Sequence, residues 1–124
     1  MKRILIIEDE KPLREAFCYL LQSEGFEVML AEHGKAGLAK LEEFEPDLIL
    51  LDMLMPIMDG MTFLQKAHLP KNHPKTRTLM LSNLSDAITF DDAAAYGVTL
   101  SVLKADLSPS QLVSTVKKVL SVSK

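Results

Sequence analysis

The sequence predicts an α/β domain built on a doubly wound parallel sheet. Short apolar segments of strand length alternate with amphipathic segments of helix length, which is the pattern of repeated βα units. Two of the strands, residues 4–7 and 48–51, are apolar throughout, as expected for strands covered by helices on both faces. Five such units follow one another along the chain, so we expect a (βα)5 fold with helices on both sides of the sheet.

Proline and glycine mark the limits of the first two helices. Pro12 stands near the start of the first helix, where the missing N–H costs nothing, and Gly25 is placed to end it. The second helix stops before Pro46, which cannot continue a helical hydrogen-bond ladder. Besides the first helix, the elements expected in this half cover residues 4–7, 26–30, 34–44 and 48–52.

The second half of the chain contains the clearest helix start. Ser108, Pro109 and Gln111 suit the N-cap, N1 and N3 positions of a capping box. Prolines and polar residues over 68–74 indicate a surface loop. The other elements expected here are a helix over 60–67, a strand over 78–81, a helix from about residue 86 to before Gly97, and a strand over 99–103.

The composition of the strands also predicts their order. Glu27 in the second strand, and the alternation of Thr99 and Ser101 with apolar residues in the fifth, are typical of edge strands. We therefore expect the order 2-1-3-4-5, a flavodoxin-like three-layer sandwich whose switch point lies between strands one and three. The polar residues that follow the strands at this edge are Glu8, Asp9, Asp52, Ser82 and Lys104.

Composition limits the functions open to the chain. With 124 residues, of which 48% are hydrophobic, it is expected to form one domain over residues 1–124. A formal charge of −3 with scattered basic residues gives no basic face, so direct binding to nucleic acid is not expected. No secretory leader is evident, and no apolar run approaches the roughly 18 residues of a membrane helix. We expect a cytoplasmic protein without membrane insertion.

The residues at the strand ends resemble the signature of a known family. An acidic pair follows strand one, an aspartate ends strand three ahead of the run Met-Pro-Ile-Met-Asp-Gly at 55–60, a serine follows strand four and a lysine follows strand five. Over essentially its whole length the chain resembles a response regulator receiver domain of the CheY-like superfamily. The resemblance implies a signalling phosphoprotein of a two-component system or phosphorelay.

The acidic cluster predicts a Mg2+ site. Three acids in one cleft repel each other and favour a divalent cation with oxygen ligands. Asp9 and Asp52 are expected to be side-chain ligands, and Glu8 is expected to lie further out and to reach the cation through a water. The resemblance implies that the backbone carbonyl of Leu54 also faces the metal.

Asp52 is the expected phosphoacceptor. A carboxylate can attack a phosphoryl group when the transferring oxygens are neutralised and held in line. Lys104 would supply positive charge to those oxygens opposite the metal. The Ser82 hydroxyl would swing inward to bind one of them and so move the following loop and helix. In this interpretation the chain assists its own phosphorylation but is not a turnover enzyme.

The resemblance implies a sensor histidine kinase or a phosphotransfer protein as phosphoryl donor, and a downstream protein target. The main alternative is a phosphorylation-independent pseudo-receiver that acts as a protein-interaction module. Two other classes fit less well. An aspartyl phosphatase needs a second acid where this chain has Leu54, and a flavodoxin needs a polar phosphate loop where residues 8–10 are acidic.

The chain departs from the family pattern at several positions. Ala105 replaces the proline that usually follows the site lysine and whose peptide bond is typically cis. A cis bond before alanine costs roughly 2.5 to 4 kcal/mol, which disfavours cis, but the sequence leaves both states open. Ser101 replaces an aromatic residue that turns inward on activation. Leu54 and Leu84 replace polar residues that help to orient water, which predicts slow loss of the phosphoryl group.

Overall fold

Five parallel strands form a single sheet in the order β2-β1-β3-β4-β5. The structure, a computed structural model, describes residues 2–53, 55, 57–82 and 90–121. The strands are β1 (Arg3–Ile7), β2 (Glu27–Ala31), β3 (Leu48–Asp52), β4 (Arg77–Ser82) and β5 (Leu100–Leu103). The predicted fold class and strand order are confirmed.

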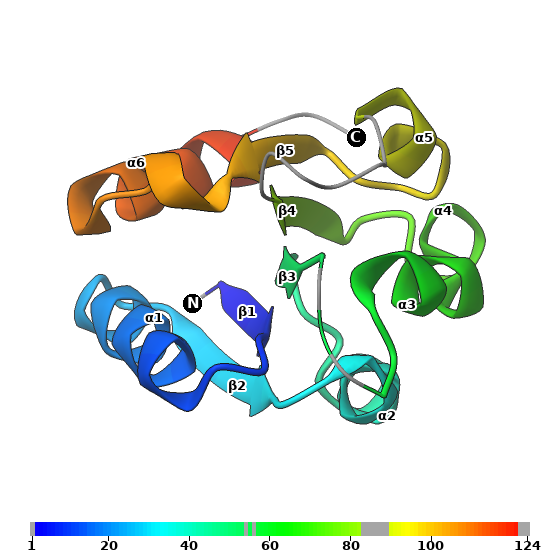
Figure 1. Cartoon of the computed structure of the whole chain (residues 1–124), viewed down its shortest axis with the longest axis horizontal. Helices are drawn as coiled ribbons and strands as arrows, with labels where there is room; N and C mark the ends of the chain where they lie inside the picture. The colour runs from blue at the N-terminus through cyan, green and yellow to red at the C-terminus, as the bar shows by residue number, and fades with distance from the viewer. Residues whose placement is uncertain (1, 54, 56, 83–89, 122–124) are drawn as a thin grey trace.

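The helices lie in two layers, one on each face of the sheet (Figure 1). One layer consists of α1 (Lys11–Ser23) and α6 (Pro109–Leu120). The other consists of α2 (Gly34–Phe44), α3 (Gly60–Ala67), α4 (Leu69–Asn72) and α5 (Phe90–Ala95). A short 3-10 helix, η1 (Lys104–Asp106), follows β5 directly. Within the described ranges, no helix has the length and apolar character needed to cross a bilayer.

Each face of the sheet carries its own hydrophobic core. Along β1, Leu5 and Ile7 contribute to the core beneath α2 and α3, whereas Ile4 and Ile6 contribute to the core beneath α1 and α6. All of β3 is buried, while β2 and β5 are only partly buried along most of their length. The continuous apolar runs therefore mark the centre of the sheet, because the side chains of a strand covered on both faces pack into the two cores.

The connection between α3 and β4 differs from the prediction. Residues 68–74 were expected to form a loop, but Leu69–Asn72 form the short helix α4. Proline is compatible with this helix because Pro70 lies in its first turn, where no intrahelical N–H bond is needed. Leu69 is buried in the core, and this tertiary contact cannot be predicted from the residues next to it in the sequence.

Helix ends agree closely with the predicted signals. The Ser108 side chain accepts a hydrogen bond from the Gln111 backbone N–H, and the Gln111 side chain accepts one from the Ser108 N–H, which confirms the capping box.

The Lys104–Ala105 peptide bond is trans. The start of the helix expected from about residue 86 lies outside the described residues.

Candidate functional site

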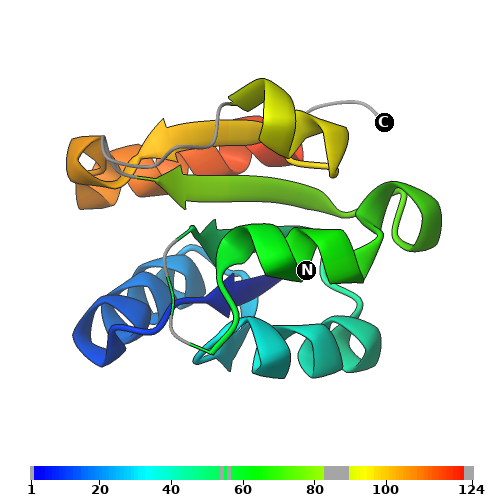
Figure 2. The ribbon, with the colours of Figure 1, turned by 45° about the vertical axis from the view of Figure 1, so that its right-hand side comes forward.

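The carboxyl ends of the parallel strands meet at one edge of the sheet, and the arrows of β4 and β5 point to this edge in Figure 2. The register places Asp52 beside Leu81 and Ser82 beside Leu103. Glu8 follows β1 and Lys104 follows β5 directly. The strand order thus brings together residues that are far apart in the sequence.

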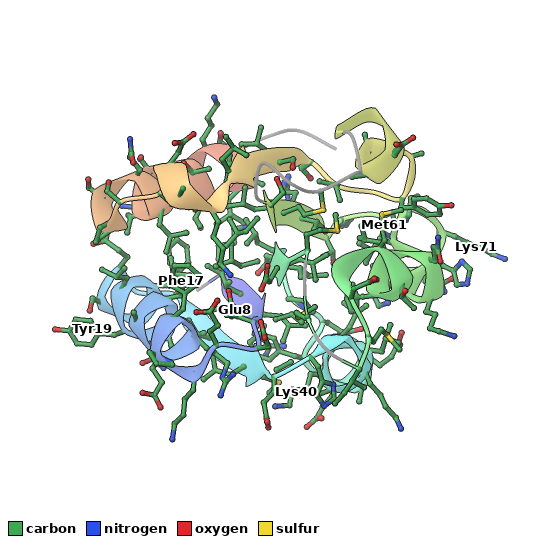
Figure 3. All side chains as sticks on the ribbon, in the orientation of Figure 1. Glu8, Phe17, Tyr19, Lys40, Met61 and Lys71 are labelled. Atoms are coloured by element: carbon green, nitrogen blue, oxygen red, sulfur yellow. The ribbon has the colours of Figure 1, made fainter. Side chains whose placement is uncertain are left out.

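Three carboxylates form an acidic cluster at this edge, contributed by Glu8, Asp9 and Asp52. One oxygen from each residue lies within 4.8 Å of the others. Glu8 is 1% exposed and Asp52 is 4% exposed, so two of the three acids are almost withdrawn from water. Figure 3 shows Glu8 in the middle of the molecule, between the two helical layers.

Lys104 provides the positive charge of the cluster. Its Nζ donates a hydrogen bond to Asp52 Oδ2 at 3.2 Å and forms an ion pair with Glu8 Oε1 at 3.0 Å that lacks hydrogen-bond geometry. A third carboxylate oxygen, Glu10 Oε1, lies 3.7 Å from the same nitrogen near solvent. One lysine therefore faces several acids and cannot neutralise all of them.

Burial shifts the proton affinities of these groups. Desolvation raises the pKa of Glu8 to about 7, although the Lys104 ammonium opposes the shift. Desolvation also raises the pKa of Asp52, against the hydrogen bond with Glu8 and the charge of Lys104. Burial alone would lower the pKa of Lys104, but its contacts with Glu8 and Asp52 outweigh burial and raise it. The cluster holds more negative charge than it can stabilise by itself, which favours an additional cation.

Met58 and Gly60 tie the segment that follows β3 to the start of α2 and to the end of β3. Gly60 N–H donates to the Met53 carbonyl at 2.9 Å, and Gly34 N–H donates to the Met58 carbonyl at 3.2 Å. A Cβ atom on Gly60 would lie 2.9 Å from the Asp52 carbonyl oxygen, so a side chain at this position would push on the backbone of the acid. Glycine is therefore required by the close approach.

The family model of the response regulator receiver domain matches residues 4–117. The chain belongs to this family. Phosphate regulon transcriptional regulatory protein PhoB of Escherichia coli is 34% identical over 122 residues, which cover 96% of this chain and 52% of PhoB. Protein-glutamate methylesterase/protein-glutamine glutaminase 3 of Rhodospirillum rubrum is 35% identical over 119 residues, which cover 95% of this chain and 32% of that protein. The chain therefore spans about a third to a half of these relatives.

Solved receiver structures share the same architecture. Chemotaxis protein CheY4 of Vibrio cholerae superimposes with a TM-score of 0.86 at 28% sequence identity, covering 96% of this chain and 98% of CheY4. The CheY-like receiver of Methanospirillum hungatei gives a TM-score of 0.82, also at 28% identity, covering 97% of this chain and 94% of its own. Membership of the receiver family indicates a part in two-component signalling.

The donor set of this receiver fits a hard divalent cation. Receiver domains typically bind Mg2+ at an acidic cluster, and the grouped oxygens of Glu8, Asp9 and Asp52 are the ligand type that Mg2+ prefers. Leu54, whose carbonyl the resemblance implies as a ligand, lies outside the described residues. Leu84, invoked for slow loss of the phosphoryl group, lies outside them as well.

Two residues near the receiver site were missed by the sequence analysis. Glu10 lies close to Lys104, and Arg14 donates hydrogen bonds to the backbone carbonyls of Glu8 and Asp9. Both are charged residues at the start of α1, where charged side chains usually face water. The only signal in the sequence is that both residues lie a few positions after the acidic pair. Charged residues at such positions are just as common on helix faces that contact only solvent.

Proposed function

We propose that this receiver accepts a phosphoryl group on Asp52 from a sensor histidine kinase or a phosphotransfer protein. The observation that carries the proposal is the pairing of Asp52 with Lys104 inside an acidic cluster at the carboxyl edge of the sheet. A solvated acid and a solvated lysine need no common crevice, whereas phosphoryl transfer needs a nucleophile and a cation side by side.

The chemistry follows from these two side chains. A carboxylate oxygen of Asp52 attacks the phosphorus, a new P–O bond forms, and the bond from phosphorus to the donor breaks with its electron pair going to the donor atom. Lys104 moves from the carboxylate to a phosphoryl oxygen and stabilises the charge there. Asp9 and Asp52, with Glu8 acting through a water, would hold a Mg2+ ion, which would supply further positive charge to the phosphoryl oxygens.

Signal output requires a second conformation. Ser82 ends β4 beside Leu103 and is partly exposed, so this residue lies at the same edge of the sheet as Lys104. We assign it the role of binding a phosphoryl oxygen and shifting the chain that follows β4. A downstream protein would then distinguish the two states at α5 and β5. In this scheme the domain accepts a phosphoryl group and does not turn over a substrate.

The pseudo-receiver remains the second candidate. Ala105 stands where the family usually carries a proline, and Ser101 stands where it usually carries an aromatic residue that turns inward on activation. A module that signals by contact alone would tolerate these changes. It would not require the cluster of acids around Lys104, which is why phosphorylation is the stronger proposal.

The test is the mass of the intact protein after incubation with acetyl phosphate, with and without Mg2+. We expect one added phosphoryl group that requires Mg2+ and disappears in Asp52→Asn. The matched control is Asp59→Asn, which removes a carboxylate from the same loop but keeps a side chain able to cap α3. No adduct in the wild type, together with no Mg2+ binding by titration, would favour the pseudo-receiver.

A further inference from the structure

Arg14 of α1 binds the backbone of the acidic loop, residues 8–10, which connects β1 to α1. Its Nη1 donates to the Glu8 carbonyl at 2.8 Å and to the Asp9 carbonyl at 3.3 Å. The same residue's backbone N–H donates to the Glu10 carbonyl at 2.9 Å. One residue therefore binds the carbonyl groups of all three residues between β1 and α1.

Among the described residues, the other contacts of this loop include the ion pairs of Lys104 with Glu8 and Glu10 and two hydrogen bonds of the backbone N–H groups. Glu8 N–H donates to the Ala31 carbonyl of β2 at 3.1 Å, and Glu10 N–H donates to Glu8 Oε2 at 3.1 Å. Glu10 is the N-cap of α1, and its side chain makes no capping hydrogen bond. Because a side-chain cap is missing, the angle between the loop and the helix depends strongly on the Arg14 guanidinium.

Arg14 acts on the backbone and not on the carboxylates. Among the described residues it forms no ion pair with an acid, and its side-chain hydrogen bonds go to carbonyl oxygens. A guanidinium bound to two successive carbonyls fixes the peptide planes on both sides of the Asp9 Cα. The direction of the Asp9 side chain follows from those planes.

We propose that Arg14 is a positioning residue for the divalent-cation site, holding the Asp9 carboxylate toward Glu8 and Asp52. The proposal rests on the proposed function, because it assumes that the acidic cluster binds Mg2+. Mg2+ demands nearly ideal octahedral geometry, whereas Ca2+ accepts flexible arrangements of oxygen ligands. A displaced Asp9 should therefore weaken Mg2+ binding more than Ca2+ binding.

The experiment is a calorimetric titration of the full chain with MgCl2 and with CaCl2 at fixed ionic strength. For Arg14→Met we expect the Kd for Mg2+ to rise about tenfold, as is typical when a group supporting a metal ligand is lost. The Kd for Ca2+ should rise by less than about threefold. The free energy of unfolding in EDTA is measured alongside, to separate a change in the site from a change in overall stability.

Two further variants make the comparison selective. Arg14→Lys keeps the charge, but its shorter side chain cannot place a nitrogen where Nη1 bonds both carbonyls, so it should also bind Mg2+ less well relative to Ca2+. It carries the test if Arg14→Met does not fold. Lys11→Met removes a charge from the same end of α1, where Lys11 is exposed and pairs only with Glu15 among the described residues, and it should leave the ratio of the two affinities unchanged.

Equal changes in both affinities, or no change, would overturn the proposal. If Arg14 acted only through its positive charge, its loss would raise the affinity of the site for Mg2+ and for Ca2+ alike, because the same repulsion is removed from each cation. If the wild type itself bound no Mg2+, the proposed function would fail and the role of Arg14 with it. If the wild type binds Mg2+ and Arg14→Met binds it with the same Kd, only the role of Arg14 is rejected and the proposed function stands.

Discussion

Lys104 Nζ donates a hydrogen bond to Asp52 Oδ2 across 3.2 Å, although 52 residues separate the two in the sequence. The contact exists because β3 and β5 both pair with β4 and end at the same edge of the sheet. It places a permanent cation beside the proposed nucleophile before any phosphoryl donor arrives. Such preorganisation lowers the cost of assembling the charges during the reaction.

Replacing Lys104 with methionine should slow phosphorylation by acetyl phosphate about 100-fold, because the developing charge on the phosphoryl oxygens loses a preorganised partner. The rate for Lys104→Arg should lie between the rates for Lys104→Met and the wild type. The measurement is the initial rate of adduct formation by intact mass. Lys117→Met, which breaks the exposed pair with Glu24 on the α1 and α6 side, should react like the wild type. An unchanged rate in Lys104→Met would remove the lysine from the mechanism.

Stability without metal should fall as the pH rises from about 5 to 8. Glu8 has a pKa of about 7 in the folded chain and an ordinary value of 4.5 when unfolded. Between these values the folded state holds the additional proton, so its stabilising effect is complete below 4.5 and is lost as the pH passes through about 7. The raised pKa of Asp52 acts in the same direction. The expected loss is on the order of 2 kcal/mol.

Urea unfolding in EDTA across this pH range measures the effect. In Glu8→Gln, the free energy of unfolding should lose most of its dependence on pH, because the amide does not titrate. Glu15→Gln, an exposed acid on α1, should keep the slope of the wild type. A stability that rises over the same range would show that Glu8 is ionised at neutral pH in the folded protein.

Mg2+ should stabilise the folded chain, and EDTA should reverse the effect. At a free Mg2+ concentration 100 times the Kd, binding to the folded state alone contributes about 2.7 kcal/mol. Asp9→Asn should lose most of this stabilisation, because it removes a charged ligand of the cluster. The readout is the urea midpoint with and without Mg2+ at constant ionic strength. Equal stabilisation of Asp9→Asn and wild type would place the ion elsewhere.

Two threonines, one just before β4 and one within it, should respond in opposite ways to the same substitution. Thr78 is fully buried, and its Oγ1 has no hydrogen-bond partner among the described residues. Thr76 is also buried, but its Oγ1 donates to the Pro46 carbonyl at 2.9 Å. Thr78→Val should stabilise the protein by about 1 kcal/mol, and Thr76→Val should destabilise it by a similar amount. Both are measured by urea unfolding, and a loss of stability in Thr78→Val would reveal a hidden partner for its hydroxyl.

Local patterns in the sequence were enough for most of the architecture. The continuous apolar run before Asp52 predicted a central strand, and β3 is buried along its length. Ser108 and Gln111 predicted a capping box, because the bonds of a cap lie within one helical turn. The short helix α4 was missed because its stability depends on burying Leu69 in the distant core.

By itself, the sequence determined the fold class, the strand order and the edge at which the acids, Ser82 and Lys104 would meet. These features follow from hydrophobic periodicity and from turn and cap residues, which act over a few neighbours. Only the tertiary structure decided that Lys104 lies between Glu8 and Asp52, that burial raises the pKa of Glu8, and that Arg14 binds the acidic loop. Distances and burial depend on strand register and on the packing of helices from both layers, which no short segment contains.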